Sequence, residues 1–156
     1  MSDKFYITTP IYYVNDKPHI GHAYTTIVAD VLARHYRQKL GDKSVYFLTG
    51  TDEHGAKIAE AAKAANISPQ EFTDQITQEF KTAWEKLDIK YNDFIRTTED
   101  RHKKIVVDIL NKLKEVGALY ESEYKGLYCV GCEKFLTDND LVDGKCPDHD
   151  REPEQV

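Results

Sequence analysis

Three cysteines and one histidine near the end of this 156-residue sequence form two pairs with the same internal spacing. Two residues separate Cys129 from Cys132, two separate Cys146 from His149, and thirteen lie between the pairs. Each pair can present two ligands from a tight turn, and the spacer is long enough for a hairpin to bring the pairs together. Because three cysteines cannot form a closed set of intrachain disulfides, the pattern predicts a metal site.

Three thiolates and one imidazole suit tetrahedral Zn²⁺. Four protein ligands leave no position for water, so we expect a structural zinc rather than a catalytic one. The ion would hold together a segment too small for its own core, a role worth on the order of 10 kcal/mol in small zinc peptides. Two alternatives fit the same pattern: Asp148 as the fourth ligand, or three reduced cysteines with an unrelated histidine and no metal.

The composition is that of an ordinary soluble, globular protein. Hydrophobic residues make up 40% and charged residues 31%, with a mean hydropathy of -0.61. The length predicts one domain or a small two-domain chain and excludes a function that needs several large domains. A net charge of -6 argues against sequence-independent coating of DNA or RNA.

The first thirty residues contain no apolar run long enough for a signal peptide or a membrane span. Charged residues interrupt them at Asp3, Lys4, Asp16 and Lys17. A cytoplasmic protein with no membrane partner is therefore the default expectation.

Strand-like and helix-like segments alternate through the first part of the chain, which predicts an α/β fold with a parallel sheet. The expected order is a strand over 5–9, a loop over 11–18, a helix over 21–40, a strand over 45–49 and a helix over 56–65. In the first helix, the apolar residues recur at helical spacing at positions Ala23, Ile27, Val31 and Leu32.

Two further helices and a strand are expected before residue 117. Ser68, Pro69 and Glu71 form a helix-start signature, and an apolar stripe predicted to face the core follows. The stripe contains Phe72, Ile76, Phe80, Ala83, Trp84 and Leu87. A strand over 93–97 precedes a helix over 99–116, which ends at Gly117. That helix is expected to turn Val106, Ile109, Leu110 and Leu113 inward and Lys103, Lys104, Lys112 and Lys114 outward.

After Gly117 the pattern changes to short strand-like pieces over 119–124 and 126–129, the cysteine cluster, and an acidic, unpatterned tail over 148–156. We therefore predict two parts: residues 1–117, which hold the α/β fold, and residues 118–156, a metal-binding segment.

The segment from Pro18 to His22 lies where the first loop becomes the first long helix, the place where open α/β sheets bind ligands. A helix start offers free N–H groups, and Gly21 has no side chain to keep a base or phosphate away. His19 and His22, on either side of it, can donate hydrogen bonds to a triphosphate. The alternative is a structural or idle loop histidine.

Residues 6–22 and 49–55, followed by the paired metal ligands, resemble the N-terminal half of bacterial methionyl-tRNA synthetases, across essentially the whole chain. The resemblance implies the first half of a class I synthetase Rossmann fold, interrupted by an incomplete connective insertion that carries the zinc. It also implies a two-step reaction. Methionine's carboxylate attacks the α-phosphate of ATP, a Mg²⁺-bound substrate, to give methionyl-adenylate and pyrophosphate. The methionyl group then passes to tRNA(Met).

By the same resemblance, His19 and His22 contact the ATP phosphates and stabilise the charge that develops during displacement, while Gly21 admits the adenine. Ile11 and Tyr13 match positions of the methionine pocket. Asp52 matches the carboxylate that pairs with the α-ammonium group, and a buried ammonium needs such an acid in any protein.

Two of these residues have plainer interpretations. Asp52 could be the N-cap of the following helix, and Tyr13 could simply pack in the core or the loop.

The sequence departs from the family pattern in several ways. Its 156 residues contain no KMSKS-like loop, second Rossmann half, anticodon-binding domain or aromatic lid, and Trp84 lies too early for that lid. We therefore expect a truncated piece that makes adenylate poorly alone, with the main tRNA-binding surface elsewhere in the full-length enzyme.

Two rival functions make different predictions. A cytidylyltransferase-like enzyme shares the histidine motif but lacks both the zinc insertion and the 49–55 segment. A zinc module that binds RNA or a protein is expected to have basic and aromatic residues around its metal site. Residues 133–156 instead hold Lys134, Lys145 and Arg151 among a larger number of acids.

Overall fold

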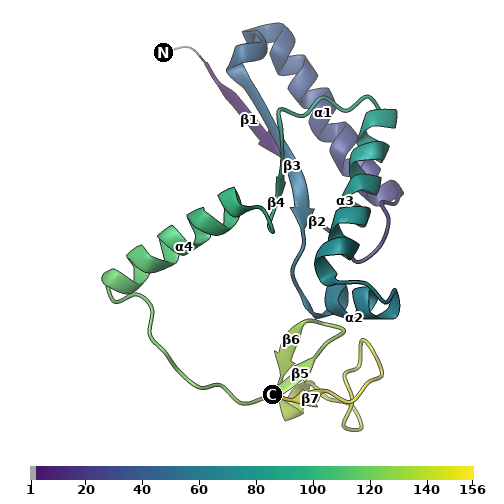
Figure 1. The fold of residues 1–156 in the computed structure, drawn as a ribbon, viewed down its shortest axis with the longest axis vertical. Helices are drawn as coiled ribbons and strands as arrows, with labels where there is room; N and C mark the ends of the chain where they lie inside the picture. Colours follow the sequence, from purple (N-terminus) through teal and green to yellow (C-terminus); the bar gives the residue numbers. More distant parts are fainter. Residues whose placement is uncertain (1–2) are drawn as a thin grey trace.

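The computed structural model describes residues 3–156, and its largest part is built on a parallel sheet (Figure 1). The central strand β3 (Val45–Asp52) pairs with β1 (Phe5–Thr8) and β2 (Tyr12–Tyr13) along one edge and with β4 (Asp93–Arg96) along the other. The predicted α/β fold with a parallel Rossmann-type sheet is confirmed. The loop expected over 11–18 is interrupted by β2, which continues the edge begun by β1.

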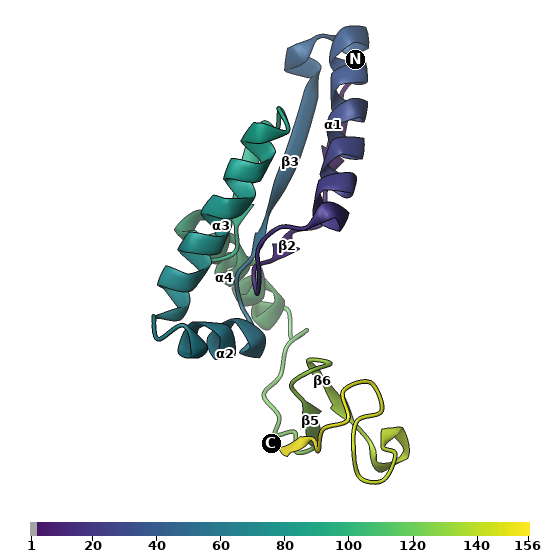
Figure 2. The same cartoon turned by 90° about the vertical axis from the view of Figure 1, so that its right-hand side faces the viewer.

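Helices α1 (Ile20–Leu40) and α3 (Pro69–Lys86) cover one face of this sheet, and the short α2 (Ala56–Ala64) leads into α3 (Figures 1 and 2). As predicted, α3 begins with Ser68 and Glu71, whose side chains each accept the other's backbone N–H. Alternating residues of β3 point toward these helices. Val45 and Phe47 are buried there, whereas Tyr46 is 45% exposed on the opposite face.

Helix α1 buries a different face from the one its apolar pattern indicates. Ile27, Val31 and Leu32 are 40%, 59% and 42% exposed. The buried positions are instead Thr26, Ala29, Asp30 and Ala33. Small side chains let the helix lie close to the sheet, and Asp30 is accommodated by an ion pair with Arg34 and by the backbone N–H of Lys90.

The predicted core stripe of α3 is correct apart from its last member. Phe80 and Trp84 are fully buried. Phe72, Ile76 and Ala83 are partly buried and pack against the same core. Leu87 is 43% exposed because the helix ends there, and the chain buries Ile89 instead.

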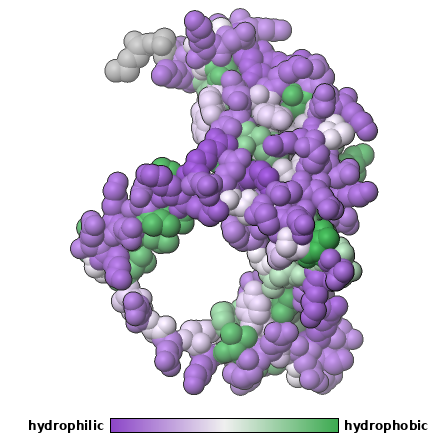
Figure 3. Space-filling model, in the orientation of Figure 1, coloured by the Kyte–Doolittle hydropathy of each residue, from purple (hydrophilic) through white to green (hydrophobic). Residues whose placement is uncertain are grey.

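Helix α4 (Asp100–Glu115) has no buried residue, so the expectation that one face turns inward is wrong. Its apolar side chains from Val106 to Leu113 are between 38% and 51% exposed at the four predicted inward positions. The helix leads away from the sheet after β4, where Arg101 in its first turn contacts Asp93. Open space lies between the rest of the helix and residues 127–155 (Figures 1 and 3). Within residues 3–156, no helix combines the length and apolarity needed to cross a membrane.

A second, antiparallel sheet follows, with β5 (Leu127–Cys129) between β6 (Lys134–Leu136) and β7 (Glu154–Gln155). No strand forms over 119–124. The tail expected to be unpatterned supplies β7, because a backbone bridge between Cys146 and Arg151 turns the chain back toward β5. Cys129, Leu136 and Cys146 form the small core of this part, which we call the knuckle (residues 127–155).

Candidate functional site

Tyr13 and Asp52 are directly paired residues at the carboxyl ends of β2 and β3. This is the edge at which open parallel sheets bind ligands. Asp52 is the last residue of β3 and is partly exposed. The N-cap of α2 is Gly55, with no side-chain cap, so the alternative that Asp52 caps this helix is wrong. Ile11 lies just before β2 and is 43% exposed.

Tyr13 connects this edge to the knuckle. Its hydroxyl donates a hydrogen bond of 2.7 Å to Oε1 of Glu133, which lies between Cys132 and β6. Burial, followed by the neighbouring Glu133 carboxylate, raises the pKa of the Tyr13 phenol well above its usual range. Gly55 passes close by, since a Cβ there would lie 2.4 Å from the Tyr13 hydroxyl oxygen. Tyr13 thus packs partly against the core and also makes a specific polar contact.

His19 and His22 form the N-terminal cap of α1. Nδ1 of His19 accepts from the backbone N–H of Gly21 at 3.1 Å, and Nδ1 of His22 accepts from the backbone N–H of His19 at 3.2 Å. Each neutral ring therefore carries its proton on Nε2. The rings stack with centroids 3.7 Å apart, and a Cβ on Gly21 would lie 2.9 Å from Cε1 of His19.

The ring of His22 also packs against the aromatic rings of Tyr12 and Phe80. Its ring centroid lies 4.9 Å from that of Tyr12 and 5.1 Å from that of Phe80. Burial, followed by repulsion from His19, lowers the pKa of His22 below its ordinary 6.5. The Tyr12 hydroxyl is in turn within 2.7 Å of the Thr26 hydroxyl in α1. Because Tyr12 points toward His22 and Tyr13 pairs with Asp52, β2 joins the two predicted motifs.

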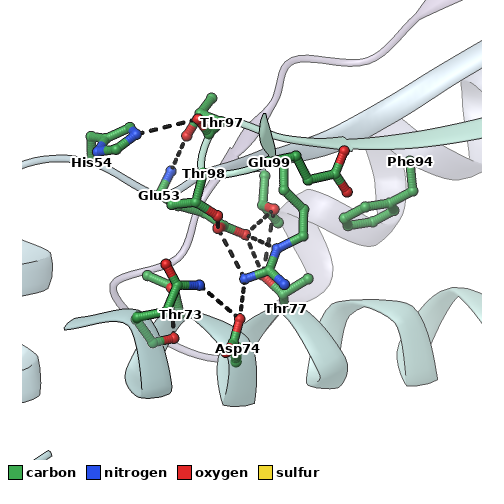
Figure 4. Close-up of polar contacts among 12 residues, drawn as sticks. Glu53, His54, Thr73, Asp74, Thr77, Phe94, Thr97, Thr98 and Glu99 are labelled. Carbon is green, nitrogen blue, oxygen red and sulfur yellow. Dashed lines mark hydrogen bonds and ion pairs between the residues drawn. The ribbon is translucent and has the colours of Figure 1, made fainter. Parts of the chain in front are cut away.

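Glu53, the residue that follows Asp52, forms a buried ion pair that the sequence analysis did not identify. Figure 4 shows the polar contacts around Glu53. The Glu53 side chain is fully buried and accepts hydrogen bonds from Nε and a terminal nitrogen of Arg96, at 2.7 and 3.0 Å. Further hydrogen bonds to Glu53 come from the hydroxyls of Thr51, Thr77 and Thr98. Burial alone would raise the pKa of Glu53, but the hydrogen bonds from Arg96 and the threonines outweigh it and hold the pKa below its ordinary value.

The four predicted metal ligands meet in the knuckle. One ligand atom from each of Cys129, Cys132, Cys146 and His149 lies within 4.8 Å of all the others. Sγ of Cys132 is 3.4 Å from Sγ of Cys146 and 3.3 Å from Nδ1 of His149. A tetrahedral zinc with metal–sulfur bonds of about 2.3 Å has ligand–ligand edges of about 3.8 Å, so the donor set fits this ion. Asp148 lies outside the group, with its carboxylate 3.7 Å from Sγ of Cys132.

The thiols of Cys129 and Cys132 differ in how readily they ionise. The backbone N–H of Cys132 lowers the pKa of Cys129. In contrast, hydrogen bonding to the Cys146 thiol, followed by burial, raises the pKa of Cys132 to about 12. Adjacent thiolates repel one another, and a divalent cation bound between them removes that penalty.

Comparison with known proteins identifies the family. A family model described as tRNA synthetases class I (M) matches residues 5–155. This chain belongs to the class I methionyl-tRNA synthetase family. Its curated relatives include a methionine–tRNA ligase of Caldanaerobacter subterraneus subsp. tengcongensis, 53% identical over 156 residues. Another, from Campylobacter jejuni, is 54% identical over 144 residues, or 92% of this chain.

This chain spans about a quarter of the length of these relatives, 24% of the first and 23% of the second. Among solved structures, Mycobacterium tuberculosis methionyl-tRNA synthetase in complex with methionyl-adenylate is 35% identical, with a TM-score of 0.88. The match covers 99% of this chain and 31% of that one. An Agrobacterium radiobacter LeuRS in a ternary complex with tRNA and LeuAMS, 21% identical with a TM-score of 0.79, shares the fold.

Proposed function

We propose that this chain forms the methionine-binding part and much of the ATP-binding part of a methionine–tRNA ligase. The observation that carries the proposal is the direct pairing of Tyr13 with Asp52 at the carboxyl edge of the sheet, beside the histidine-capped start of α1. Support also comes from the fold shared with a relative that holds methionyl-adenylate. The reaction joins methionine's carboxylate to the α-phosphate of ATP, breaks the bond to pyrophosphate, and then transfers the methionyl group to tRNA(Met).

In this proposal Asp52 pairs with the α-ammonium group of methionine. Its carboxylate is partly exposed and follows the buried Thr51, so it can meet a ligand in a partly desolvated setting, where an ion pair is stronger than in water. Tyr13 and Ile11, from the neighbouring edge, contact the rest of the amino acid. Holding the ammonium fixes where the carboxylate points, and such orientation contributes to the rate.

His19 and His22 act on the triphosphate of the Mg²⁺-bound ATP. Because backbone N–H groups occupy both Nδ1 atoms, the two Nε2–H groups remain as donors for phosphate oxygens. Donors fixed before the reaction stabilise charge that builds on the phosphates, without covalent chemistry by the protein. Gly21 admits the adenine, and the base then competes with the His19 ring for the space above this glycine.

We further propose a structural zinc at Cys129, Cys132, Cys146 and His149, in a connective insertion over residues 118–156 that follows a nucleotide-binding part over 1–117. Support comes from the converging ligand atoms and the small core around them. Zinc there supplies no reaction step. It fixes the turn that carries Glu133, and thereby the partner of the Tyr13 hydroxyl.

Residues 1–156 contain no KMSKS-like motif, whose lysines bind pyrophosphate in this family, so we propose that this chain alone makes methionyl-adenylate poorly. Contacts with tRNA(Met) lie mainly in other parts of the full-length enzyme. Methionine-dependent exchange of pyrophosphate into ATP measures the first step. Robust exchange by this chain alone would overturn the proposal about its activity.

Binding tests the site itself. Calorimetric titration with methionine and with Mg²⁺–ATP should give binding to the wild-type chain. Asp52→Asn should weaken the binding of methionine and leave the affinity for ATP unchanged. His22→Ala should weaken the binding of ATP and leave the affinity for methionine unchanged. If both substitutions leave both affinities unchanged, these residues do not form the proposed site.

A further inference from the structure

The proposed reaction leaves Glu53 without a role, although this carboxylate is among the most constrained groups at the site. Its side chain is fully buried and joins three elements: the end of β3, the end of β4 and the middle of α3. We call Glu53, Arg96 and the threonine hydroxyls that contact Glu53 the Glu53 clamp; these hydroxyls belong to Thr51, Thr77 and Thr98. Figure 4 shows the Glu53 carboxylate with its labelled partners Thr77 and Thr98.

The clamp fixes the backbone on one side of Asp52 while leaving its carboxylate available. Side chains alternate along a strand, so Thr51 and Glu53, which contact each other, face α3, and Asp52 points the other way. The backbone N–H of Glu53 donates to the Thr97 hydroxyl at 2.9 Å, and the carbonyl of Asp52 accepts from Val14 at 3.3 Å. Asp52 is thus held from both neighbouring chain segments.

The geometry of the ion pair restricts the orientation of both the Arg96 and the Glu53 side chains. Arg96 is 18% exposed and reaches Glu53 through two nitrogens, and one of these also contacts Asp74 at 2.5 Å. Planar two-point contacts of this kind fix orientation as well as distance. A structural ion pair anywhere in the sheet could add stability, but this one involves the residue directly after the proposed ammonium partner.

We propose that Glu53 is a positioning residue, which holds the end of β3 so that the Asp52 carboxylate meets the α-ammonium group of the amino-acid substrate. This inference rests on the proposed function of Asp52. Glu53→Gln keeps the shape of the side chain but removes the charge, so Arg96 loses its two-point partner and the strand end loosens around Asp52.

The test compares two ligands on four proteins by calorimetry. The ligands are methionine and 4-(methylthio)butanoic acid, which is methionine without its ammonium group. The proteins are the wild type, Asp52→Asn, Glu53→Gln and the double variant. Glu71→Gln is the matched control, because it removes one carboxylate from the capping box of α3 without touching the clamp.

We expect Glu53→Gln to raise the Kd for methionine about tenfold and to leave the Kd for the ammonium-free analogue unchanged. In the Asp52→Asn background, Glu53→Gln should have no further effect. A loss of affinity for both ligands alike, or full additivity with Asp52→Asn, would mean a merely structural role and overturn the proposal.

The two proposals fail in different ways. If the wild type binds both ligands with equal affinity, Asp52 does not pair with the ammonium group, and the proposed role of Asp52 is wrong. If Asp52→Asn weakens the binding of methionine and Glu53→Gln does not, the proposed function stands and the positioning role of Glu53 is wrong.

Amide hydrogen exchange gives a readout that needs no ligand. Glu53→Gln should speed exchange at residues 52–55 relative to the wild type, whereas Glu71→Gln should speed it only near the start of α3. Unchanged exchange at 52–55 in folded Glu53→Gln protein would show that the clamp does not hold this segment, and would overturn the inference.

Discussion

Gly131 has to be glycine because the ring of His149 lies against it. A Cβ at this position would be 2.5 Å from two carbon atoms of the imidazole ring. We predict that Gly131→Ala displaces His149 and raises the Kd for zinc by about tenfold or more, since such overpacking costs about 1–3 kcal/mol. Competition with a chromophoric chelator measures the change.

Gly144→Ala is the control in the same knuckle. The backbone of Gly144 has a φ of +79°, a conformation in which alanine is strained, but no atom lies within 4 Å of the added Cβ. This variant should lose some stability and keep its zinc affinity. Equal weakening of zinc binding in both variants would contradict the role of the His149 contact.

His22 should titrate below 6.5, because burial and then the neighbouring His19 disfavour its charged form. The folded pKa is the lower one, so the unfolded chain binds more protons in the window between that value and 6.5. Stability is therefore complete above pH 6.5 and decreases as the pH falls through this window.

The two causes can be separated by His19→Gln. Removing His19 abolishes the repulsion and leaves the burial, so the pKa of His22 should rise yet stay below 6.5. An NMR titration of the His22 Cε1–H signal measures both proteins. A midpoint at or above 6.5 in the wild type would contradict the burial by Tyr12 and Phe80.

At the scale of elements, α3 and α4 are both amphipathic, but only α3 buries its apolar face. Phe80 in α3 is fully buried, whereas Leu110 in α4 is 46% exposed. Phe80→Ala should lower the free energy of unfolding by about 3–5 kcal/mol, and Leu110→Ala should change it by less than about 0.5 kcal/mol. Urea denaturation measures both, and a large loss for Leu110→Ala would mean that α4 packs in solution.

The sequence predicted most elements because their signals are local. The cap formed by Ser68 and Glu71 and the alternation of strands and helices depend only on near neighbours. The buried faces were harder. Periodicity shows that α4 is amphipathic, but not whether another element covers it, and the close packing of α1 selects Ala29 and Ala33 over larger neighbours.

The same division holds for the candidate site. The metal ligands and the histidine pair come from compact motifs, so their proximity could be predicted from spacing. The Glu53 clamp could not, because Glu53, Thr77 and Arg96 lie far apart in the sequence and meet only when β3, α3 and β4 assemble. β7 was missed for a similar reason, since two residues of an acidic tail carry no strand signal of their own.

Over the whole molecule, a parallel sheet with a substantial core is joined to a knuckle whose core is much smaller. The first core includes Phe47, Phe80 and Trp84, all fully buried, while the second consists of Cys129, Leu136 and Cys146. The hydrogen bond from Tyr13 to Glu133 links the two parts. Their stabilities should therefore respond differently to loss of the proposed zinc.

Removing zinc with a strong chelator should unfold the knuckle and leave the parallel sheet folded. The small core cannot offset the conformational entropy of some thirty residues without the metal, whose contribution is on the order of 10 kcal/mol. In ¹H–¹⁵N spectra, the signals of residues 127–155 should collapse toward random-coil positions. Those of β3 should persist, with changes near Tyr13 as its partner Glu133 is released.

Glu133→Gln separates the link from the metal. This variant should keep its zinc and its knuckle signals while reproducing the changes near Tyr13, since only the charged acceptor of the Tyr13 hydroxyl is altered. Two results would contradict this account: a knuckle that stays folded after chelation, or a parallel sheet that unfolds together with it. The first would mean that residues 127–155 fold without metal, and the second that the two parts form one cooperative unit.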